Sequence, residues 1–213
     1  MTDHVAQVSS PPAAPVAVAR PAASLLVLRG AGRTHEPEVL MGVRGAAHKF
    51  MPNRLVFPGG RVDDEDLTAA CASALRADVL ARLMRGADQT LAQAIAVAAA
   101  RELEEETGLT LGAPPEVAGF DYLCRAITPE RSPIRFDARF LVVDAEMVTG
   151  TLAGSGELEG LRWYGLGQAL ALDLAFPTRG VLERLTLWLA LSEAERQHQA
   201  NVATLRNRGW VME

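Results

Sequence analysis

Cysteine is scarce in this sequence, and acidic residues outnumber basic ones. Cys71 and Cys124 are its only cysteines in 213 residues. Two are too few for the disulfide framework of a small secreted domain, so we expect free, buried thiols in a reducing, cytoplasmic compartment. The net charge is −5. A basic surface for the nucleic-acid backbone is therefore not expected.

A long hydrophobic run is also missing. The most apolar stretch, "LAQAIAVAAA" (91–100), is shorter than the roughly 20 apolar residues that span a bilayer. Residues 1–24, "MTDHVAQVSSPPAAPVAVARPAAS", lack the basic and continuous apolar regions of a signal peptide. Their Pro and Ala bias predicts a disordered segment over 1–23. The remainder, 49% hydrophobic overall, suits one globular domain over 24–197 with a tail, 198–213, that matches no pattern.

Short apolar segments predict a mixed α/β domain. The expected strands are 24–30, 38–45, 54–57, 117–127, 135–145 and 158–166, the first two forming a hairpin. The expected longer helices are 67–85, 90–107 and 178–197. Asp88 or Thr90 can cap the second helix, and Gly108 ends it. Strands interleaved with long helices predict a mixed sheet covered by helices on its faces.

The end of the second helix reads "RELEEETGL" (101–109) and is strongly acidic. Glu102, Glu105 and Glu106 stand at i, i+3 and i+4, so they share one face, while Glu104 points elsewhere. Their mutual repulsion and the helix dipole both oppose this arrangement. Two interpretations remain open: a solvated helix end, or a site for a hard divalent cation such as Mg²⁺.

The stretch "FPGGRVDDED" (57–66) favours the cation. Glycines at the end of a strand let the backbone approach a ligand closely, since they present no Cβ. A carbonyl there can join a metal shell. The alternative is an ordinary tight turn.

These residues resemble the Nudix family. Residues 101–109 match the second half of the Nudix box, R-E-U-x-E-E-x-G-U, and Gly60 matches its opening glycine, with Asp66 where the box has a glutamate. Gly60 and Arg101 are 41 positions apart, which implies an insertion of about 27 residues, over roughly 67–90. Such an insertion resembles the subgroup that includes the peroxisomal coenzyme A diphosphatases. The fold implied is the Nudix α/β/α sandwich, with a central mixed β-sheet and a helical insertion within the box.

The resemblance implies a metal-dependent diphosphatase. Glu102, Glu105 and Glu106 would hold Mg²⁺ or Mn²⁺ together with the Gly59 carbonyl, and Glu102 could instead act on the attacking water. Arg101, beside them in the catalytic set, would fix the loop and helix by pairing with a box carboxylate.

A distal metal ligand is also expected before the late tryptophan strand. Glu157 is the first candidate and Glu159 the second. A solvent-facing loop carboxylate is the alternative for both. Asp66 would assist the metal or hold the loop.

The resemblance says less about the substrate than about the metal ligands. Residues 40–60 can be laid over the family's coenzyme A signature: Leu40, Arg44 and "FPGG" agree, and Lys49 stands where arginine is expected. Cations gather around the approach to the acidic helix, as a polyphosphate requires, unless they are scattered surface residues. The candidates are Arg44, Lys49, Arg54, Arg61 and Arg135.

The leading hypothesis is therefore a small-molecule diphosphate hydrolase acting on coenzyme A or acyl-CoA, without a nucleic-acid or membrane partner. The alternatives are a nucleotide-sugar, dinucleotide or nucleoside triphosphate pyrophosphohydrolase, and a non-catalytic nucleotide-sensing domain. Retention of all three box glutamates favours catalysis. The apolar stripe of the inserted helix fits a homodimer interface and core packing equally well.

Overall fold

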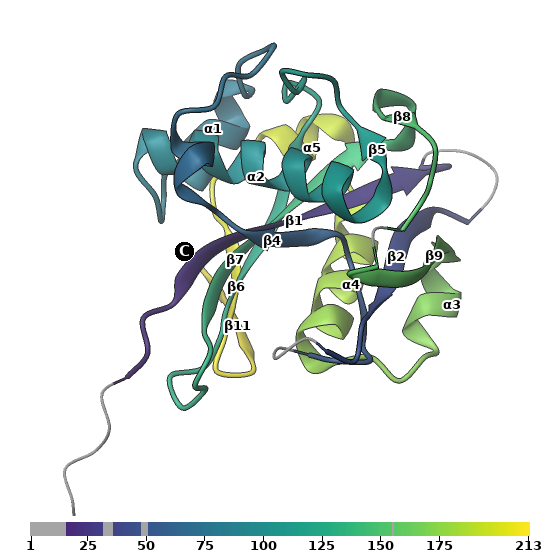
Figure 1. Ribbon diagram of the computed structural model, residues 1–213. Coiled ribbons are helices and arrows are strands. Elements are labelled where there is room, and N and C mark those ends of the chain that lie inside the picture. The colour runs from purple at the N-terminus through teal and green to yellow at the C-terminus, as the bar shows by residue number, and fades with distance from the viewer. Residues whose placement is uncertain (1–15, 32–35, 48–50, 155) are drawn as a thin grey trace, which may run out of the picture.

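A computed structural model describes residues 16–31, 36–47, 51–154 and 156–213, which form a large sheet with helices on both faces (Figure 1). The strands are β1 (Arg20–Arg29), β2 (Glu38–Arg44), β3 (Leu55–Val56), β4 (Gly59–Arg61), β5 (Leu109–Thr110), β6 (Asp121–Ile127), β7 (Phe136–Asp144), β8 (Thr149–Gly150), β9 (Leu158–Gly165), β10 (Ala203–Arg206) and β11 (Gly209–Met212). The helices are η1 (Asp64–Leu67), α1 (Ala77–Leu83), α2 (Gln89–Thr107), η2 (Ala145–Met147), α3 (Leu166–Leu170), α4 (Phe176–Leu189) and α5 (Glu193–Gln197).

The sheet is mixed, as the sequence predicts. Its order is β11-β10-β6-β7-β1-β2-β3, with β4 paired to β1 and β9 paired to β2. β1 and β2 are antiparallel neighbours, with Leu28 opposite Val39, which confirms the predicted hairpin. β1 and β7 run parallel through nine paired positions. β5 and β8 form a separate two-stranded sheet.

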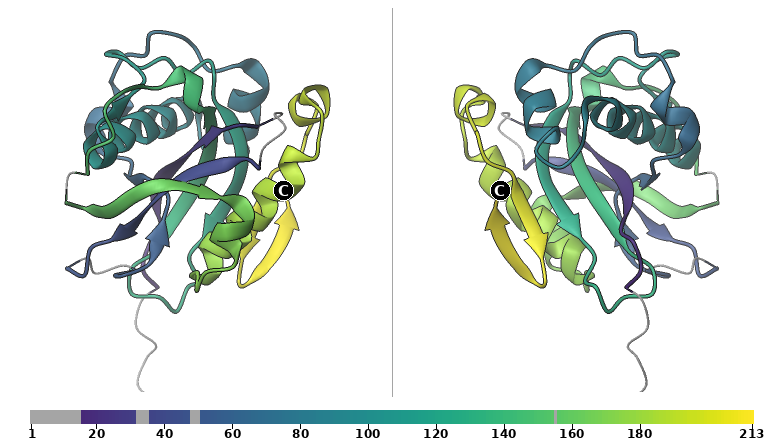
Figure 2. Two further views of the ribbon diagram at one scale, coloured as in Figure 1. Left: turned by 90° about the vertical axis from the view of Figure 1, so that its right-hand side faces the viewer. Right: turned by 90° about the vertical axis from the view of Figure 1, so that its left-hand side faces the viewer.

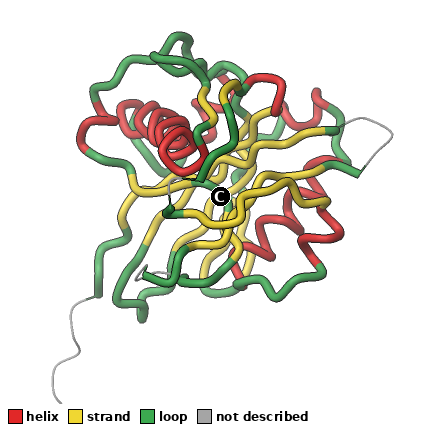
Figure 3. The backbone as a smooth tube through the Cα atoms, turned by 45° about the vertical axis from the view of Figure 1, so that its right-hand side comes forward, coloured by secondary structure: helices red, strands yellow, loops and turns green. Residues whose placement is uncertain are grey.

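β1 lies at the centre and is buried on both faces. Leu25 and Val27 belong to the apolar core beneath α1 and α2. Leu26 and Leu28 belong to the core beneath α3 and α4. Successive side chains of a strand point to opposite faces, so one strand supplies both cores. Figures 2 and 3 show the helices on the two sides of the sheet, which is the expected three-layer arrangement.

α2 confirms the predicted helix over 90–107 and delivers the acidic residues to one end of the sheet. Its first turn is capped by Asp88, whose side chain accepts a hydrogen bond from the Leu91 N–H at 2.8 Å. It ends at Gly108, which has a φ of 72°. The middle of the helix is mostly alanine and is buried against the sheet. Small side chains there permit close packing and fix the height of the helix above the sheet.

The single helix predicted over 67–85 is wrong. Residues 68–76 are not helical, because tertiary hydrogen bonds hold them: the Ala72 N–H donates to the Pro115 carbonyl, and Ser73 accepts from the Val117 N–H. α1 then buries Val79 and Leu83 in the core beneath α2. Part of the apolar stripe is thus used for packing within the chain, while Leu67 and Met84 are exposed.

The single helix predicted over 178–197 is also wrong. α4 and α5 are separate, because Ser192 starts a new helix with a capping box to Glu195. Arg196 also donates to the Leu189 and Leu191 carbonyls, which satisfies backbone groups at the end of α4.

Both ends of the expected domain differ in detail from the sequence-based boundaries. β1 begins at Arg20 rather than near residue 24, so the disorder predicted over 1–23 is wrong for residues 20–23, and residues 1–15 of that segment lie outside the described residues. Residues 198–213, which match no pattern in the sequence, include β10 and β11. β10 pairs in parallel with β6, so these residues continue the main sheet. Within the described residues, no helix is long and apolar enough to cross a membrane.

Candidate active site

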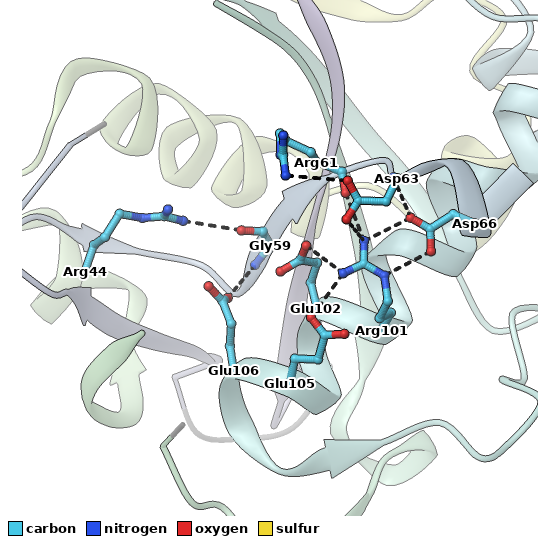
Figure 4. Close-up of polar contacts among 9 residues, drawn as sticks. All are labelled: Arg44, Gly59, Arg61, Asp63, Asp66, Arg101, Glu102, Glu105 and Glu106. Carbon is cyan, nitrogen blue, oxygen red and sulfur yellow. Dashed lines mark hydrogen bonds and ion pairs between the residues drawn. The ribbon is translucent and has the colours of Figure 1, made fainter. Parts of the chain in front are cut away.

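The carboxyl end of α2 presents its glutamates toward β4 (Figure 4). Glu102 and Glu106 are buried, with relative exposures of 9% and 2%, whereas Glu105 is exposed. Glu104 lies elsewhere and accepts a hydrogen bond from the Thr110 hydroxyl at 3.2 Å. The helical register therefore separates Glu104 from the other three glutamates, as the i, i+3, i+4 spacing predicts.

The glycine strand reaches these carboxylates despite the long segment between them. The Gly59 N–H donates to Glu106 Oε2 at 2.8 Å. A Cβ on Gly60 would lie 2.1 Å from Glu102 Oε1, so no side chain fits there without moving that carboxylate. Pairing of Gly59 with Ser24 holds β4 against the central strand. The two glycines therefore allow backbone and carboxylate to meet.

Arg101 ties the segment after β4 to the helix. Its Nε and Nη2 donate to the two Asp66 oxygens at 3.0 and 2.9 Å, a bidentate pair. Its Nη1 donates to Glu102 and Glu105 at 2.9 and 3.1 Å. Asp66 is buried and also accepts the Asp63 N–H at 2.8 Å. Arg101 is thus a positioning residue, and Asp66 holds the loop.

Burial disfavours charge on two of the carboxylates. It raises the pKa of Glu106 to about 7, although the Gly59 N–H and the Arg44 charge oppose the rise. It also raises the pKa of Glu102, against the attraction of Arg101. The negative charge of Glu157 contributes to both shifts. A cation among these groups would relieve the cost of ionising them.

The carboxylate and carbonyl oxygens at this site are suitable ligands for a hard divalent cation. The glutamate side chains, however, are already paired with other groups of the protein. No three His, Cys, Asp or Glu side chains in the described ranges are gathered as a ready metal site. Glu102 and Glu105 pair with Arg101, and Glu106 accepts the Gly59 N–H. Carboxylate and carbonyl oxygens are nevertheless the ligands that Mg²⁺ and Mn²⁺ take. Joint coordination requires Glu102 and Glu105 to turn from Arg101 toward Glu106.

A cleft of about 770 Å³ opens beside the carboxylates. Arg44 and Arg61 line it together with Arg101. Arg44 Nη2 donates to the Gly59 carbonyl oxygen at 3.3 Å, and Arg61 makes an exposed ion pair with Asp63 at 3.6 Å. These cations lie at the acidic end of the cleft, where an anionic ligand would need them.

Two of the other predicted substrate-binding residues do not line this cleft. The Arg54 guanidinium pairs with Asp173 at 2.7 Å. Arg135 donates to the carbonyls of Thr128 and Ala17. Their guanidinium groups contact these partners within the chain, and substrate binding by either arginine stays a prediction. Lys49 lies outside the described residues.

Glu157 suits the predicted role of a distal metal ligand better than Glu159 does. Glu157 lines the cleft and its charge acts on both buried glutamates. Its backbone carbonyl accepts the Gly45 N–H at 3.1 Å, which anchors the loop beside β2. Glu159 is paired with Val43 in the sheet and is not among the residues lining the cleft.

The far end of the cleft is formed by residues that sequence reasoning did not identify. Phe176 and Thr178 come from the start of α4, and Asn207 and Arg208 come from the turn between β10 and β11. The available signal was Asn207 followed by Gly209 between two short apolar alternations, a pattern typical of a tight hairpin.

Comparisons with known proteins agree with the sequence motif. A family model described as the NUDIX domain matches residues 92–185, from within α2 to within α4. No curated protein matches the sequence.

Solved structures resemble the fold at low sequence identity. The NUDIX hydrolase from Alicyclobacillus acidocaldarius aligns with a TM-score of 0.58 and 23% identity, covering 78% of this chain and 90% of that one. The MutT NUDIX hydrolase from Burkholderia pseudomallei aligns at 0.51 and 20%, covering 79% and 99%. The MutT protein from Methanosarcina mazei Go1 aligns at 0.52 and 18%, covering 81% and 96%.

Proposed function

We propose that the chain is a Nudix hydrolase, a divalent-metal-dependent diphosphatase acting on a nucleotide-derived compound. The observation that carries this proposal is the contact between Gly59 and Glu106, which are 47 positions apart. It brings a glycine strand to a pair of buried carboxylates at the acidic end of a cleft.

The unfavourable electrostatics of this cluster support metal binding. Glu102 and Glu106 are both buried, and the charge of Glu102 disfavours ionisation of Glu106. A structural role alone would be served by neutral side chains. We assign metal binding to Glu105, Glu106, Glu157 and the Gly59 carbonyl, and Glu102 either joins these ligands or acts instead on the attacking water. When bound, Mg²⁺ or Mn²⁺ supplies positive charge that stabilises phosphate oxygens and makes attack by water easier.

Glu102 is the preferred group for handling the attacking water. Its carboxylate lies against Gly60 and is held by Arg101 at 2.9 Å, so its position is fixed. Burial raises its pKa, which brings the carboxylate closer to the pKa range of an effective general base. Glu102 would accept a proton from water as the water oxygen bonds to phosphorus. The bridging P–O bond breaks, and the bridging oxygen leaves on the second phosphate.

Arg44 and Arg61 are assigned to the substrate phosphates. Both line the cleft at its acidic end. Guanidinium groups bind phosphate oxygens through paired, charge-assisted hydrogen bonds. Arg61 has only a long, exposed ion pair with Asp63, which costs little to exchange for a phosphate.

Coenzyme A or acyl-CoA is the substrate that the match over residues 40–60 favours, and Arg44 of that match lines the cleft. Cleavage would yield phosphopantetheine, or its acyl form, and a phosphorylated adenosine nucleotide. A screen of coenzyme A, nucleotide sugars, dinucleotides and nucleoside triphosphates with Mg²⁺ or Mn²⁺ tests this assignment. Efficient cleavage of another compound with coenzyme A inert would overturn it.

The hydrolase proposal is tested by a matched pair of variants on α2. Glu106→Gln removes a buried carboxylate that lines the cleft, whereas Glu104→Gln removes one that lies outside it. We expect the first to lose at least a hundredfold in kcat, a typical cost of removing one stabilising group, and the second to keep wild-type activity. Full activity of Glu106→Gln with metal present would refute the assignment.

A further inference from the structure

The C-terminal hairpin, residues 203–212, lies outside the 92–185 stretch that matches the family model, yet it forms part of the cleft wall. β10 pairs with β6, placing Leu205 beside Ala126. The turn that follows consists of Asn207 and Arg208, with φ values of 50° and 66°. This tight turn places both residues at the far end of the cleft, away from the acidic end.

Phe176 and Arg208 form an open aromatic and cationic pair at that end. Phe176 is 48% exposed, whereas Val181 and Leu182 of the same helix are fully buried. The Arg208 guanidinium carbon lies 5.8 Å from the Phe176 ring centroid. The other guanidinium–ring pairs in the described chain lie at 3.9–4.5 Å. The Phe176 ring is therefore less closely covered, near the outer limit of a cation–π contact.

The hairpin is firmly held in this position. A Cβ on Gly180 of α4 would lie 3.5 Å from the Trp210 ring, so the tryptophan packs over the glycine. The Glu213 carboxylate accepts hydrogen bonds from Arg125 and Thr204 at 3.2 and 2.9 Å. The position of Arg208 is therefore fixed by contacts on both sides of the turn.

We infer that Phe176 and Arg208 form a nucleobase subsite, through which the C-terminal hairpin contributes to substrate selection. This inference rests on the proposed function, because it takes the diphosphate to lie at the glutamates. The apolar lining between the two ends includes Ala126, Ile127, Ala138 and Leu205. An exposed aromatic face stacks on any base, and the guanidinium favours a flat ring with acceptor atoms over an aliphatic chain.

Binding of AMP and of ribose 5-phosphate, measured by calorimetry, tests the subsite without turnover. The two probes share the sugar and phosphate, and only AMP has a base. We expect the wild type to bind AMP more tightly. Phe176→Ala should weaken AMP binding about tenfold and leave ribose 5-phosphate unchanged. Arg208→Asn, chosen because asparagine tolerates the left-handed backbone, should weaken AMP binding about threefold.

Matched controls distinguish the subsite from general surface changes. Leu187→Ala removes an exposed apolar side chain of the same helix, and Arg162→Ala removes an arginine stacked 4.4 Å from the Tyr164 ring; neither residue lines the cleft. Both should bind AMP as the wild type does. Equal binding of the two probes by the wild type, or unaltered AMP binding by both test variants, would overturn the inference. Glu106→Gln tests hydrolysis separately and should retain the preference for AMP.

Discussion

Gly60 packs directly against Glu102, so that a Cβ on the glycine would lie 2.1 Å from Oε1 of the glutamate. Gly60→Ala must therefore move the carboxylate that we assign to the attacking water. The end of a side chain can shift at modest cost, so we expect a stability change of only about 1 kcal/mol with a loss of at least tenfold in kcat. Steady-state kinetics and thermal unfolding measure both.

The control for this prediction is Gly45→Ala. The nearest atoms to a Cβ at Gly45 lie at 3.7 Å, an ordinary contact distance. Activity and stability should both stay near wild type. Equal activity of Gly60→Ala and Gly45→Ala would contradict the assigned role of Glu102.

Arg101 should contribute much more to stability than Arg61. Arg101 makes a bidentate pair with buried Asp66, and removing the arginine leaves that carboxylate without its partner. We expect Arg101→Ala to lower the free energy of unfolding by roughly 3 kcal/mol. Arg61→Ala breaks only an exposed pair and should cost less than about 1 kcal/mol. Urea denaturation compares the two; equal costs would show that the Arg101–Asp66 pair does not hold the loop.

The raised pKa of Glu106 predicts a pH dependence of the metal-free protein. Its pKa is about 7 when folded against an ordinary value of 4.5, so the folded state binds this proton more tightly than the unfolded chain. That contribution to stability is complete below pH 4.5 and is lost as the pH rises through 7.

The glutamine of Glu106→Gln is neutral at every pH, so this variant does not lose stability as the pH rises through 7. In EDTA near pH 8 it should be more stable than the wild type by roughly 3 kcal/mol, and near pH 5 the difference should fall to about 1 kcal/mol or less. Chemical denaturation at the two pH values measures the change, with Glu104→Gln as the control. A stability difference between Glu106→Gln and the wild type that does not vary with pH would contradict the raised pKa of Glu106.

The segment between β4 and α2 should contribute to the hydrophobic core and so to the free energy of unfolding. Leu83 of α1 is 1% exposed, whereas the adjacent Met84 is 45% exposed. Leu83→Ala should lower the free energy of unfolding by roughly 2–4 kcal/mol, and Met84→Ala by well under 1 kcal/mol. Both should remain in the oligomeric state of the wild type by light scattering. A change of state in Met84→Ala would instead indicate a subunit interface.

Local patterns were sufficient to predict which residues meet at the acidic end of the cleft. Helical spacing separated Glu104 from the three other glutamates, and the glycine pair correctly predicted a close backbone approach, which the Gly59–Glu106 hydrogen bond confirms. Two short apolar segments and the turn residues between them likewise predicted the antiparallel pairing of β1 with β2. Each of these features depends on residues close together in the chain or on a recognised motif.

Long-range pairings explain what was not predicted. β10 joins the sheet through β6, about 80 positions earlier, so residues 198–213 gave no local indication of their place. Ser73 prevents helix over part of 67–85 by bonding to a loop more than 40 positions later. Arg54 pairs with Asp173, which is 119 positions away. Composition and spacing contain no information about such partners.

Binding of Mn²⁺ to the substrate-free protein, followed by electron paramagnetic resonance, tests the central claim most directly. Wild type and Glu104→Gln should bind the ion alike. Glu106→Gln should weaken binding at least tenfold, and so should Glu105→Gln, because each removes a proposed oxygen ligand. Wild-type Mn²⁺ affinity in both of these variants would show that the acidic end of α2 does not hold the metal.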